Sequence, residues 1–169
     1  MEASLEQIAQ SLRLADRIAI LSHSSPDGDT LGCASALAMT LQGMGKQAKV
    51  VCSDPIPRRL SYLFDGVEQQ EFEPAYVISV DVAEPKLLGP ATEPYLHRLD
   101  ACIDHHKSNS MAQYASLSYV DTGAGAACEI MYELVRLLAP ITQPVADSLY
   151  TGLCTDTGCF RFSNTTSRT

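Results

Sequence analysis

The residues best suited to chemistry in this sequence gather in one short segment, His23-Ser24-Ser25-Pro26-Asp27-Gly28-Asp29. Pro26 and Gly28 are turn formers, which let the chain double back so that several side chains point at one place. The alternating acids Asp27 and Asp29 would then face neighbouring positions, one towards each of two cations. A solvated turn is the plain alternative, because Pro-Asp-Gly-Asp is also common turn chemistry.

More acids and histidines follow at the ends of other apolar segments. One such segment runs into Asp81, and a second runs into Asp104-His105-His106. Taken alone, Asp81 and Asp156 are more typical of helix caps or turns. An acid and two imidazoles crowded together, however, titrate awkwardly unless something organises them. Together with the first segment, these residues predict a metal site.

Strands that alternate with helices must position these side chains. Short apolar runs predict strands at residues 17–22, 48–52, 76–80, 101–103 and 114–120. Amphipathic or capped segments predict helices at residues 4–16, from Thr30 to Gly43, at 125–138 and at 143–154, with a short helix between Pro55 and Phe64. The alternation predicts an α/β fold: a doubly wound, mostly parallel sheet with helices on both faces.

Parallel strands also explain why distant residues would meet. In such sheets ligands bind beyond the carboxyl ends of the strands. Three predicted strands run into Asp or His at that end, at His23, at Asp81 and at Asp104. We therefore expect one site at one edge of the sheet.

Length and composition restrict the class of protein. A chain of 169 residues with 46% hydrophobic content is sized for one domain. The apolar stretches are too short to span a membrane and the N-terminus lacks signal-peptide features, so we expect a cytoplasmic protein without a membrane partner. The net charge of −8 argues against binding of long duplex nucleic acid, although metal ions can still attract a phosphate. The six cysteines form no Cys-x-x-Cys pair, which indicates free thiols.

In order and approximate spacing, His23-x-x-Pro26-Asp27-x-Asp29, Asp81, Asp104-His105-His106 and Asp156 resemble the four motifs of the DHH phosphoesterase superfamily. The resemblance covers nearly the whole chain. The segment from Gly152 to Thr166 is most similar to the bacterial nanoRNase branch. Enzymes of that branch degrade very short oligoribonucleotides and also remove the 3′-phosphate of adenosine 3′,5′-bisphosphate.

The resemblance implies a centre of two divalent ions, usually Mn²⁺, with Mg²⁺ as the alternative. By motif position, His23 and Asp27 would hold one ion, and Asp81 would bridge both. The second ion would be held by Asp29, His105 and Asp156. Oxygen and imidazole ligands without thiolates suit Mn²⁺ better than structural zinc.

Three residues are expected to take part in catalysis beyond ligation alone: Asp81, Asp104 and His106. The resemblance leaves His106 free to meet the substrate phosphate and makes Asp104 an orienter of the histidines. Four carboxylates balance two divalent ions, so a bound phosphodiester needs further positive charge from His106, Arg161 or Arg168. The expected mechanism is hydrolysis by a metal-bridging hydroxide.

Complete members of the family carry a second, C-terminal substrate-binding domain. We therefore expect residues 1–169 to form the catalytic DHH domain and the second domain to lie outside this chain, which leaves the activity of the isolated chain open. The expected substrates are short RNA oligonucleotides or nucleotide phosphates, and a homodimer is one option. A cyclic dinucleotide phosphodiesterase and an inorganic pyrophosphatase of family II type are alternatives within the same chemistry. A non-catalytic metal- or nucleotide-binding module is the alternative from another class.

Overall fold

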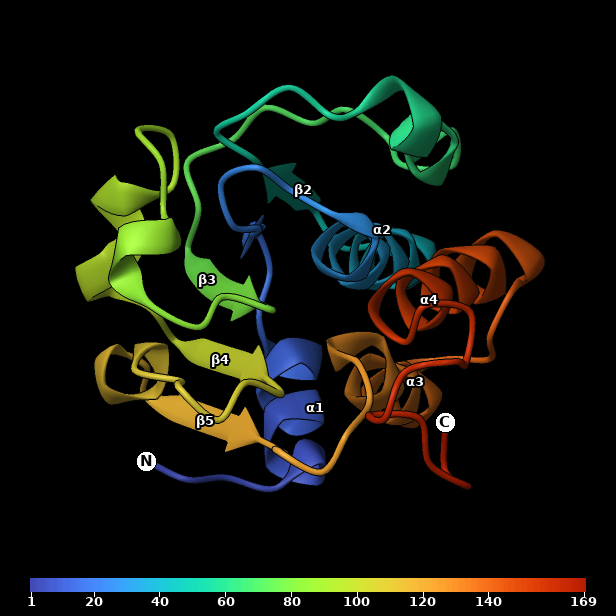
Figure 1. Ribbon diagram of the computed structural model, residues 1–169. Coiled ribbons are helices and arrows are strands. Elements are labelled where there is room, and N and C mark those ends of the chain that lie inside the picture. Colours follow the sequence, from blue (N-terminus) through green and yellow to red (C-terminus); the bar gives the residue numbers. More distant parts are fainter.

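Five short apolar segments form one parallel sheet in the computed structural model, which describes residues 1–169 (Figure 1). The strands are β1 (Ile18–Leu21), β2 (Ala48–Val51), β3 (Tyr76–Val80), β4 (Ala101–Asp104) and β5 (Leu117–Val120). They lie in the order β2-β1-β3-β4-β5, and every neighbouring pair is parallel. Every residue of β1 and β4 is buried, as a sheet covered on both faces requires.

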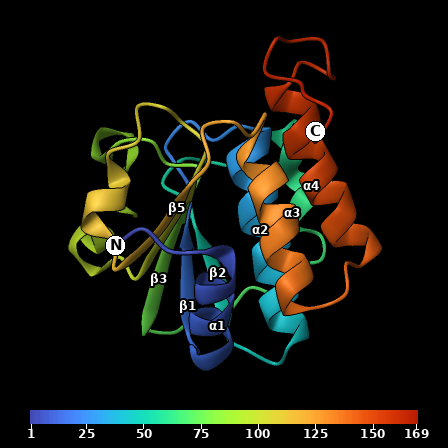
Figure 2. The same cartoon turned by 90° about the horizontal axis from the view of Figure 1, so that it is seen from below.

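All four α-helices cover one face of this sheet (Figure 2). They are α1 (Leu5–Leu14), α2 (Gly28–Gly43), α3 (Ala127–Leu138) and α4 (Gln143–Asp156). Their apolar sides pack with the same side of the strands into a cluster of 28 buried residues. At the start of α1, Ser4 and Gln7 form the capping box that their spacing predicts.

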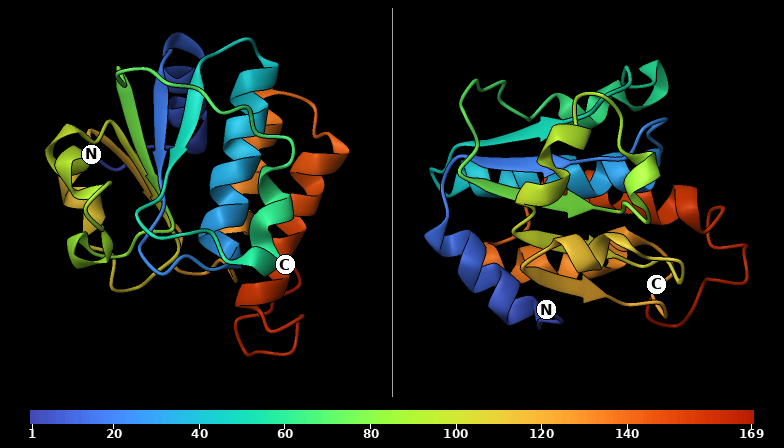
Figure 3. Two further views of the ribbon diagram at one scale, coloured as in Figure 1. Left: turned by 90° about the horizontal axis from the view of Figure 1, so that it is seen from above. Right: turned by 90° about the vertical axis from the view of Figure 1, so that its left-hand side faces the viewer.

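The opposite face is covered by short 3-10 helices (Figure 3). These are η2 (Pro85–Leu87), η3 (Glu93–Arg98) and η4 (Met111–Tyr114), while η1 (Arg58–Phe64) lies against α2 and α4. The buried cluster on this face contains 9 residues. Pro85, Pro90 and Pro94 interrupt the connection between β3 and β4, and proline does not fit the interior of an α-helix. The predicted α/β class is confirmed, with α-helices on one face and 3-10 helices on the other.

Several element boundaries differ from those predicted. The second helix begins at Gly28 rather than Thr30, because the Asp27 carboxylate caps it. The segment predicted as a strand from residue 114 forms the end of η4 first, and β5 starts only at Leu117. The segment expected as a short helix is the 3-10 helix η1. None of the helices is both long and apolar enough to cross a lipid bilayer.

The order of the strands creates a position for a site. The chain passes from β1 to β2 on one side and then returns to β3 on the other side of β1. The loops that leave the carboxyl ends of β1 and β3 therefore diverge, and ligands bind at such points in doubly wound folds. The first of these loops begins with Ser22 and leads to His23, and the second begins with Asp81.

Candidate metal centre

Hydrogen bonds fix the loop that follows β1. Ser25 has a left-handed φ of 51°, and its N–H donates to Asp54 Oδ2 (2.5 Å), which ties the loop to the segment after β2. The Nδ1 of His23 lies 2.7 Å from the carbonyl oxygen of Ser24. Because a carbonyl oxygen only accepts, Nδ1 carries the proton, and Nε2 keeps a lone pair free for a cation.

Asp27 both ends this loop and begins α2. Its Oδ1 accepts hydrogen bonds from the backbone N–H groups of Asp29 (2.9 Å) and Thr30 (3.2 Å). Burial alone would raise the pKa of Asp27, but His23 and these N–H groups outweigh it and lower the pKa. The Asp27 carboxylate is therefore ionised at neutral pH, as a metal ligand must be.

The six side chains that the sequence predicted as ligands come together in two groups. His23 Nε2 lies 3.8 Å from both Asp27 Oδ1 and Asp81 Oδ2. His105 Nε2 lies 3.8 Å from Asp29 Oδ2 and 3.6 Å from Asp156 Oδ2. In each group the ligand atoms all lie within 4.8 Å of one another. We name them the His23 group (His23, Asp27, Asp81) and the His105 group (Asp29, His105, Asp156).

Asp81 lies between the two groups. Its Oδ2 faces His23, whereas its Oδ1 lies 3.6 Å from His105 Nε2. The residue is only 2% exposed, yet Oδ1 has no hydrogen-bond partner. Burial and the nearby carboxylates of Asp29 and Asp27 raise the pKa of Asp81 well above its ordinary value. A buried carboxylate that lacks donors and faces other acids fits a place beside cations, which would supply the missing partner.

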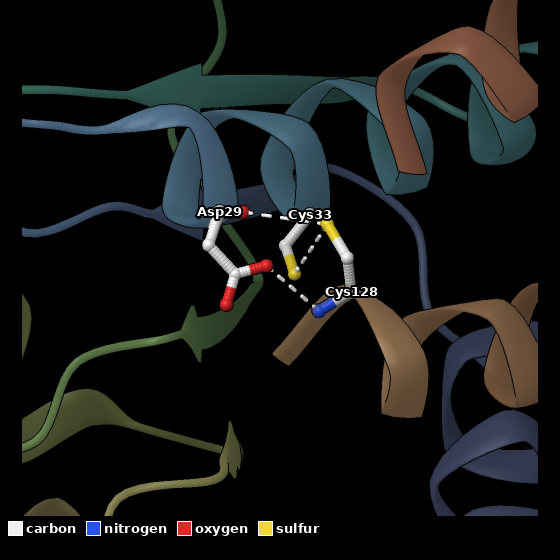
Figure 4. Close-up of side chains that lie close together, drawn as sticks. All are labelled: Asp29, Cys33 and Cys128. Carbon is white, nitrogen blue, oxygen red and sulfur yellow. Dashed lines mark hydrogen bonds between the residues drawn. The ribbon is translucent and has the colours of Figure 1, made fainter. Parts of the chain in front are cut away.

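Asp29 is also held by the start of α3 (Figure 4). Its Oδ2 accepts a hydrogen bond from the N–H of Ala127 (2.6 Å), and its Oδ1 accepts one from the N–H of Cys128 (2.9 Å). The carboxylate thus caps a helix whose own N-cap, Ala126, has no side chain able to do so. Burial raises the pKa of Asp29 to about 6. No signal in the sequence indicated this contact, which joins residues far apart in the chain.

Two buried thiols lie beneath Asp29. Cys33, one turn further along α2, has its Sγ 3.4 Å from Sγ of Cys128 (Figure 4). Burial raises the pKa of the Cys33 thiol to about 12 and that of the Cys128 thiol well above its usual range. Both are therefore protonated and packed as small apolar groups. All six cysteines are free thiols, as the sequence predicted.

Asp104 lies outside both ligand groups and instead holds His106. The Nδ1 of His106 donates to Asp104 Oδ1 (2.8 Å), and Asn109 Nδ2 donates to Asp104 Oδ2 (2.6 Å). Burial alone would raise the pKa of Asp104, but these two donors and the N–H of His105 lower it. The hydrogen bond that His106 donates to Asp104 in turn raises the pKa of His106. Asn109 was not among the predicted residues, because its role depends on how the loop folds back after β4.

A cavity of about 280 Å³ opens over the two groups. It is lined by His23, Ser24, Asp27, Asp81, Leu87, His106 and Asp156. Of the two arginines considered as additional cations, Arg168 pairs with Asp121 (2.6 Å) and Glu129 (2.8 Å) instead of lining the cavity. Arg161 donates to the carbonyl oxygen of Gly158 and is exposed. His106 lines the cavity without belonging to the His23 group or the His105 group.

Curated proteins similar to this chain include two bacterial enzymes of the same name. The chain is 35% identical over 158 residues to the bifunctional oligoribonuclease and PAP phosphatase NrnA of Thermus thermophilus, covering 88% of this chain and 46% of that protein. It is 29% identical over 169 residues to the protein of the same name from Bacillus subtilis, covering 96% of this chain and 53% of that one. The chain thus spans about half the length of the curated relatives it matches.

Solved structures share the fold. An exopolyphosphatase-related protein from Bacteroides fragilis superposes with a TM-score of 0.83 at 20% identity, over 96% of this chain and 52% of that one. CDC45 from Entamoeba histolytica superposes with a TM-score of 0.59 at 17% identity, over 94% of this chain and 34% of that one. At these identities the likeness concerns the fold alone.

The family itself follows from the sequence match. Residues 17–153 match the DHH family, N-terminal domain. That range includes five of the six clustered ligand side chains and the Asp104-His105-His106 motif. The resemblance read from the motifs is therefore confirmed, and the chain belongs to the DHH family as its N-terminal domain.

Proposed function

We propose that this chain is the catalytic domain of a metal-dependent phosphoesterase that hydrolyses short oligoribonucleotides and the 3′-phosphate of adenosine 3′,5′-bisphosphate. The observation that carries the proposal is the pair of ligand groups with Asp81 between them. Two adjacent sites built from carboxylates and imidazoles are suited to two divalent ions such as Mn²⁺ or Mg²⁺. When bound, two such ions activate a water molecule and neutralise charge on the phosphoryl group.

Each ligand residue has a proposed place. His23 and Asp27 would hold one ion, and Asp29, His105 and Asp156 would hold the other. Asp81, which faces both sets of residues, would serve both ions. The four carboxylates balance the charge of two divalent ions, so that a bound phosphate dianion or diester still requires a further positive or donating group.

His106 supplies that group in our proposal. Its Nδ1 donates to Asp104, so Nε2 remains for the substrate, and the side chain lines the cavity above the ligand groups. The raised pKa of His106 favours its protonated form, which donates a hydrogen bond to a phosphoryl oxygen. Asp104 acts through His106 and is a positioning residue, while Asp81 would act on the phosphate through the ions that it would help to hold.

The names of the relatives, the net charge and the cavity support the proposed substrate class. The curated relatives are named as oligoribonucleases and PAP phosphatases. The net charge of −8, with 12 Lys and Arg against 20 Asp and Glu, disfavours binding along the backbone of a long duplex. A small cavity with metal sites suits a short, terminal phosphate-bearing substrate. For the whole protein we propose the same substrates and a cytoplasmic compartment.

Turnover of four substrates tests the proposal. These are 5′-phosphorylated RNA of two to four nucleotides, adenosine 3′,5′-bisphosphate, a cyclic dinucleotide and pyrophosphate, each assayed with Mn²⁺ and with chelator. We expect chelator-sensitive turnover of the first two, lost in Asp81→Asn. Preference for the cyclic dinucleotide or pyrophosphate would favour the corresponding alternative. Binding of Mn²⁺ without turnover of any substrate would favour a non-catalytic binding module.

A further inference from the structure

The segment that follows α4, residues 157–169, folds back over the loop between β5 and α3. In Figure 2 it lies beyond the end of α4, at the edge of the sheet where α2 and α3 begin. We name it the C-terminal brace. None of its side chains belongs to the ligand groups. It reaches the metal centre through the backbone carbonyl oxygens of Gly125 and Asp156.

Asn164 makes the central contact of this brace. Its Nδ2 donates to the carbonyl oxygen of Gly125 (2.8 Å) and to that of Asp156 (3.1 Å). One side-chain amide thereby fixes the end of α4, which carries the Asp156 carboxylate, to the loop that leads into α3. The two segments are otherwise separate in the chain, because α3 and its connection to α4 lie between them.

The loop that Asn164 holds contacts the other two members of the His105 group. The carbonyl oxygen of Ala124 lies 3.3 Å from Nδ1 of His105, which leaves Nε2 for the metal site. Immediately afterwards, the N–H groups of Ala127 and Cys128 donate to the Asp29 carboxylate. Asp29, His105 and Asp156 thus each depend on a backbone group within or next to the segment that Asn164 fixes.

Charged residues reinforce the same loop. The Glu129 side chain, only 5% exposed, accepts from the N–H of Gly125 (3.1 Å) and pairs with Arg168 (2.8 Å). Arg168 also pairs with Asp121 at the start of the loop (2.6 Å). The brace approaches this loop closely, since a Cβ added to Gly125 would lie 2.8 Å from the carbonyl oxygen of Asn164.

The His23 group is held by different elements. His23 bonds to Ser24, and its loop is anchored by Asp54, while Asp27 caps α2. No hydrogen bond joins residues 157–169 to this group. The brace therefore acts on one half of the centre only.

We propose that Asn164 is a positioning residue for one of the two metal sites, the one formed by the His105 group. The inference rests on the proposed function insofar as that function requires two ions. Loss of the Asn164 amide frees the loop and the end of α4 to move apart. Removal of a group that orients metal ligands without binding the metal itself lowers metal affinity by about 10- to 100-fold. The second site, at the His23 group, keeps its affinity.

The number of Mn²⁺ ions bound per chain tests this assignment without an activity assay. Equilibrium dialysis is run at the lowest free Mn²⁺ concentration that fills both sites of the wild type. We expect Asn164→Ala to retain one ion and His23→Ala to retain one ion. The double variant should retain none. Asn164→Ala added to Asp156→Asn should remove nothing further, because both changes affect the same site.

Asn109→Ala is the matched control, since it removes the same side-chain amide from the Asp104 side of the centre, and we expect it to keep both ions. Retention of two ions by Asn164→Ala, or an additional loss in the Asp156→Asn background, would overturn the inference. If Asn164→Ala does not fold, as judged by circular dichroism in chelator, Asn164→Leu, which has a similar size and no donor, is tested identically. A wild type that binds no Mn²⁺ would instead refute the proposed function, and the inference with it.

Discussion

Replacing Asp81 by Asn should stabilise the metal-free protein while removing its response to metal. Asp81 is 2% exposed, its Oδ1 has no hydrogen-bond donor, and burial raises its pKa. At pH 8 the carboxyl is ionised in the unfolded chain, so the folded state alone bears the cost of burying it. Asn removes the charge without changing the shape, and it tolerates the left-handed φ of 56° at this position.

The size of the effect follows from the missing partner. A buried acceptor without a donor costs about 1–3 kcal/mol. In a chain of this size 1 kcal/mol moves Tm by about 2–4 °C. We therefore expect Tm of Asp81→Asn to lie roughly 6 °C above that of the wild type in chelator, by the middle of both ranges. Added Mn²⁺ should raise Tm of the wild type and leave that of the variant unchanged.

Asp104→Asn provides a control in which the same substitution should act in the opposite direction. Asp104 is fully buried at the end of β4, but it accepts hydrogen bonds from His106, Asn109 and the N–H of His105. An amide there turns one acceptor into a donor that faces other donors, at a cost of about 1–3 kcal/mol. Tm in chelator should fall by roughly 6 °C. The reasoning is refuted if both variants shift Tm in the same direction, or if Mn²⁺ still stabilises Asp81→Asn.

Three further outcomes are expected. In chelator, the free energy of unfolding should fall by about 2 kcal/mol as pH rises from about 4.5 to 8, because the pKa of Asp29 is raised from 3.8 to about 6 and the folded chain binds more protons in that window; urea titrations that show rising stability would contradict this. Gly152→Ala should lower Tm by roughly 3–9 °C in thermal denaturation, since its Cβ would lie 2.2 Å from a buried cysteine sulfur, whereas Gly43→Ala, with no atom within 4 Å, should not. Asn109→Ala should lower kcat on short RNA about 10- to 100-fold with unchanged Mn²⁺ binding, because it loosens Asp104; an unchanged kcat would remove Asn109 from the site.

Local signals in the sequence indicated part of the ligand set, and the resemblance to the DHH motifs supplied the rest, including Asp156. His23, Asp81 and His105 stand at the carboxyl ends of apolar strands, and parallel strands bring such ends to one edge. The same argument gave the α/β class. The residues that position the ligand side chains without being ligands themselves could not be found in this way. Asn164 and the partners of Asp29 act through contacts between segments far apart in the chain, and no periodicity or spacing encodes them.

The helical cover was predictable only in part for a related reason. An α-helix that covers one face of the sheet can be predicted from the periodicity of its apolar residues, as in α1 and α3. The segments between β3 and β5 contain no such period. Their 3-10 helices form because prolines and short connections leave no room for a longer helix, which depends on the sheet they cross.

The unequal cover of the sheet gives the molecule a strong and a weak side. The α-helical side buries 28 clustered residues, against 9 on the side of the 3-10 helices, so local opening should begin on the latter. Asp29 and Asp156 belong to the strong side, whereas the loop with His106 and Asn109 leads into η4 on the weak one. Cations bound between the two sides would link the 3-10-helical layer, which opens readily, to the more stable α-helical layer. The order of the 3-10-helical layer would then depend on the supply of metal.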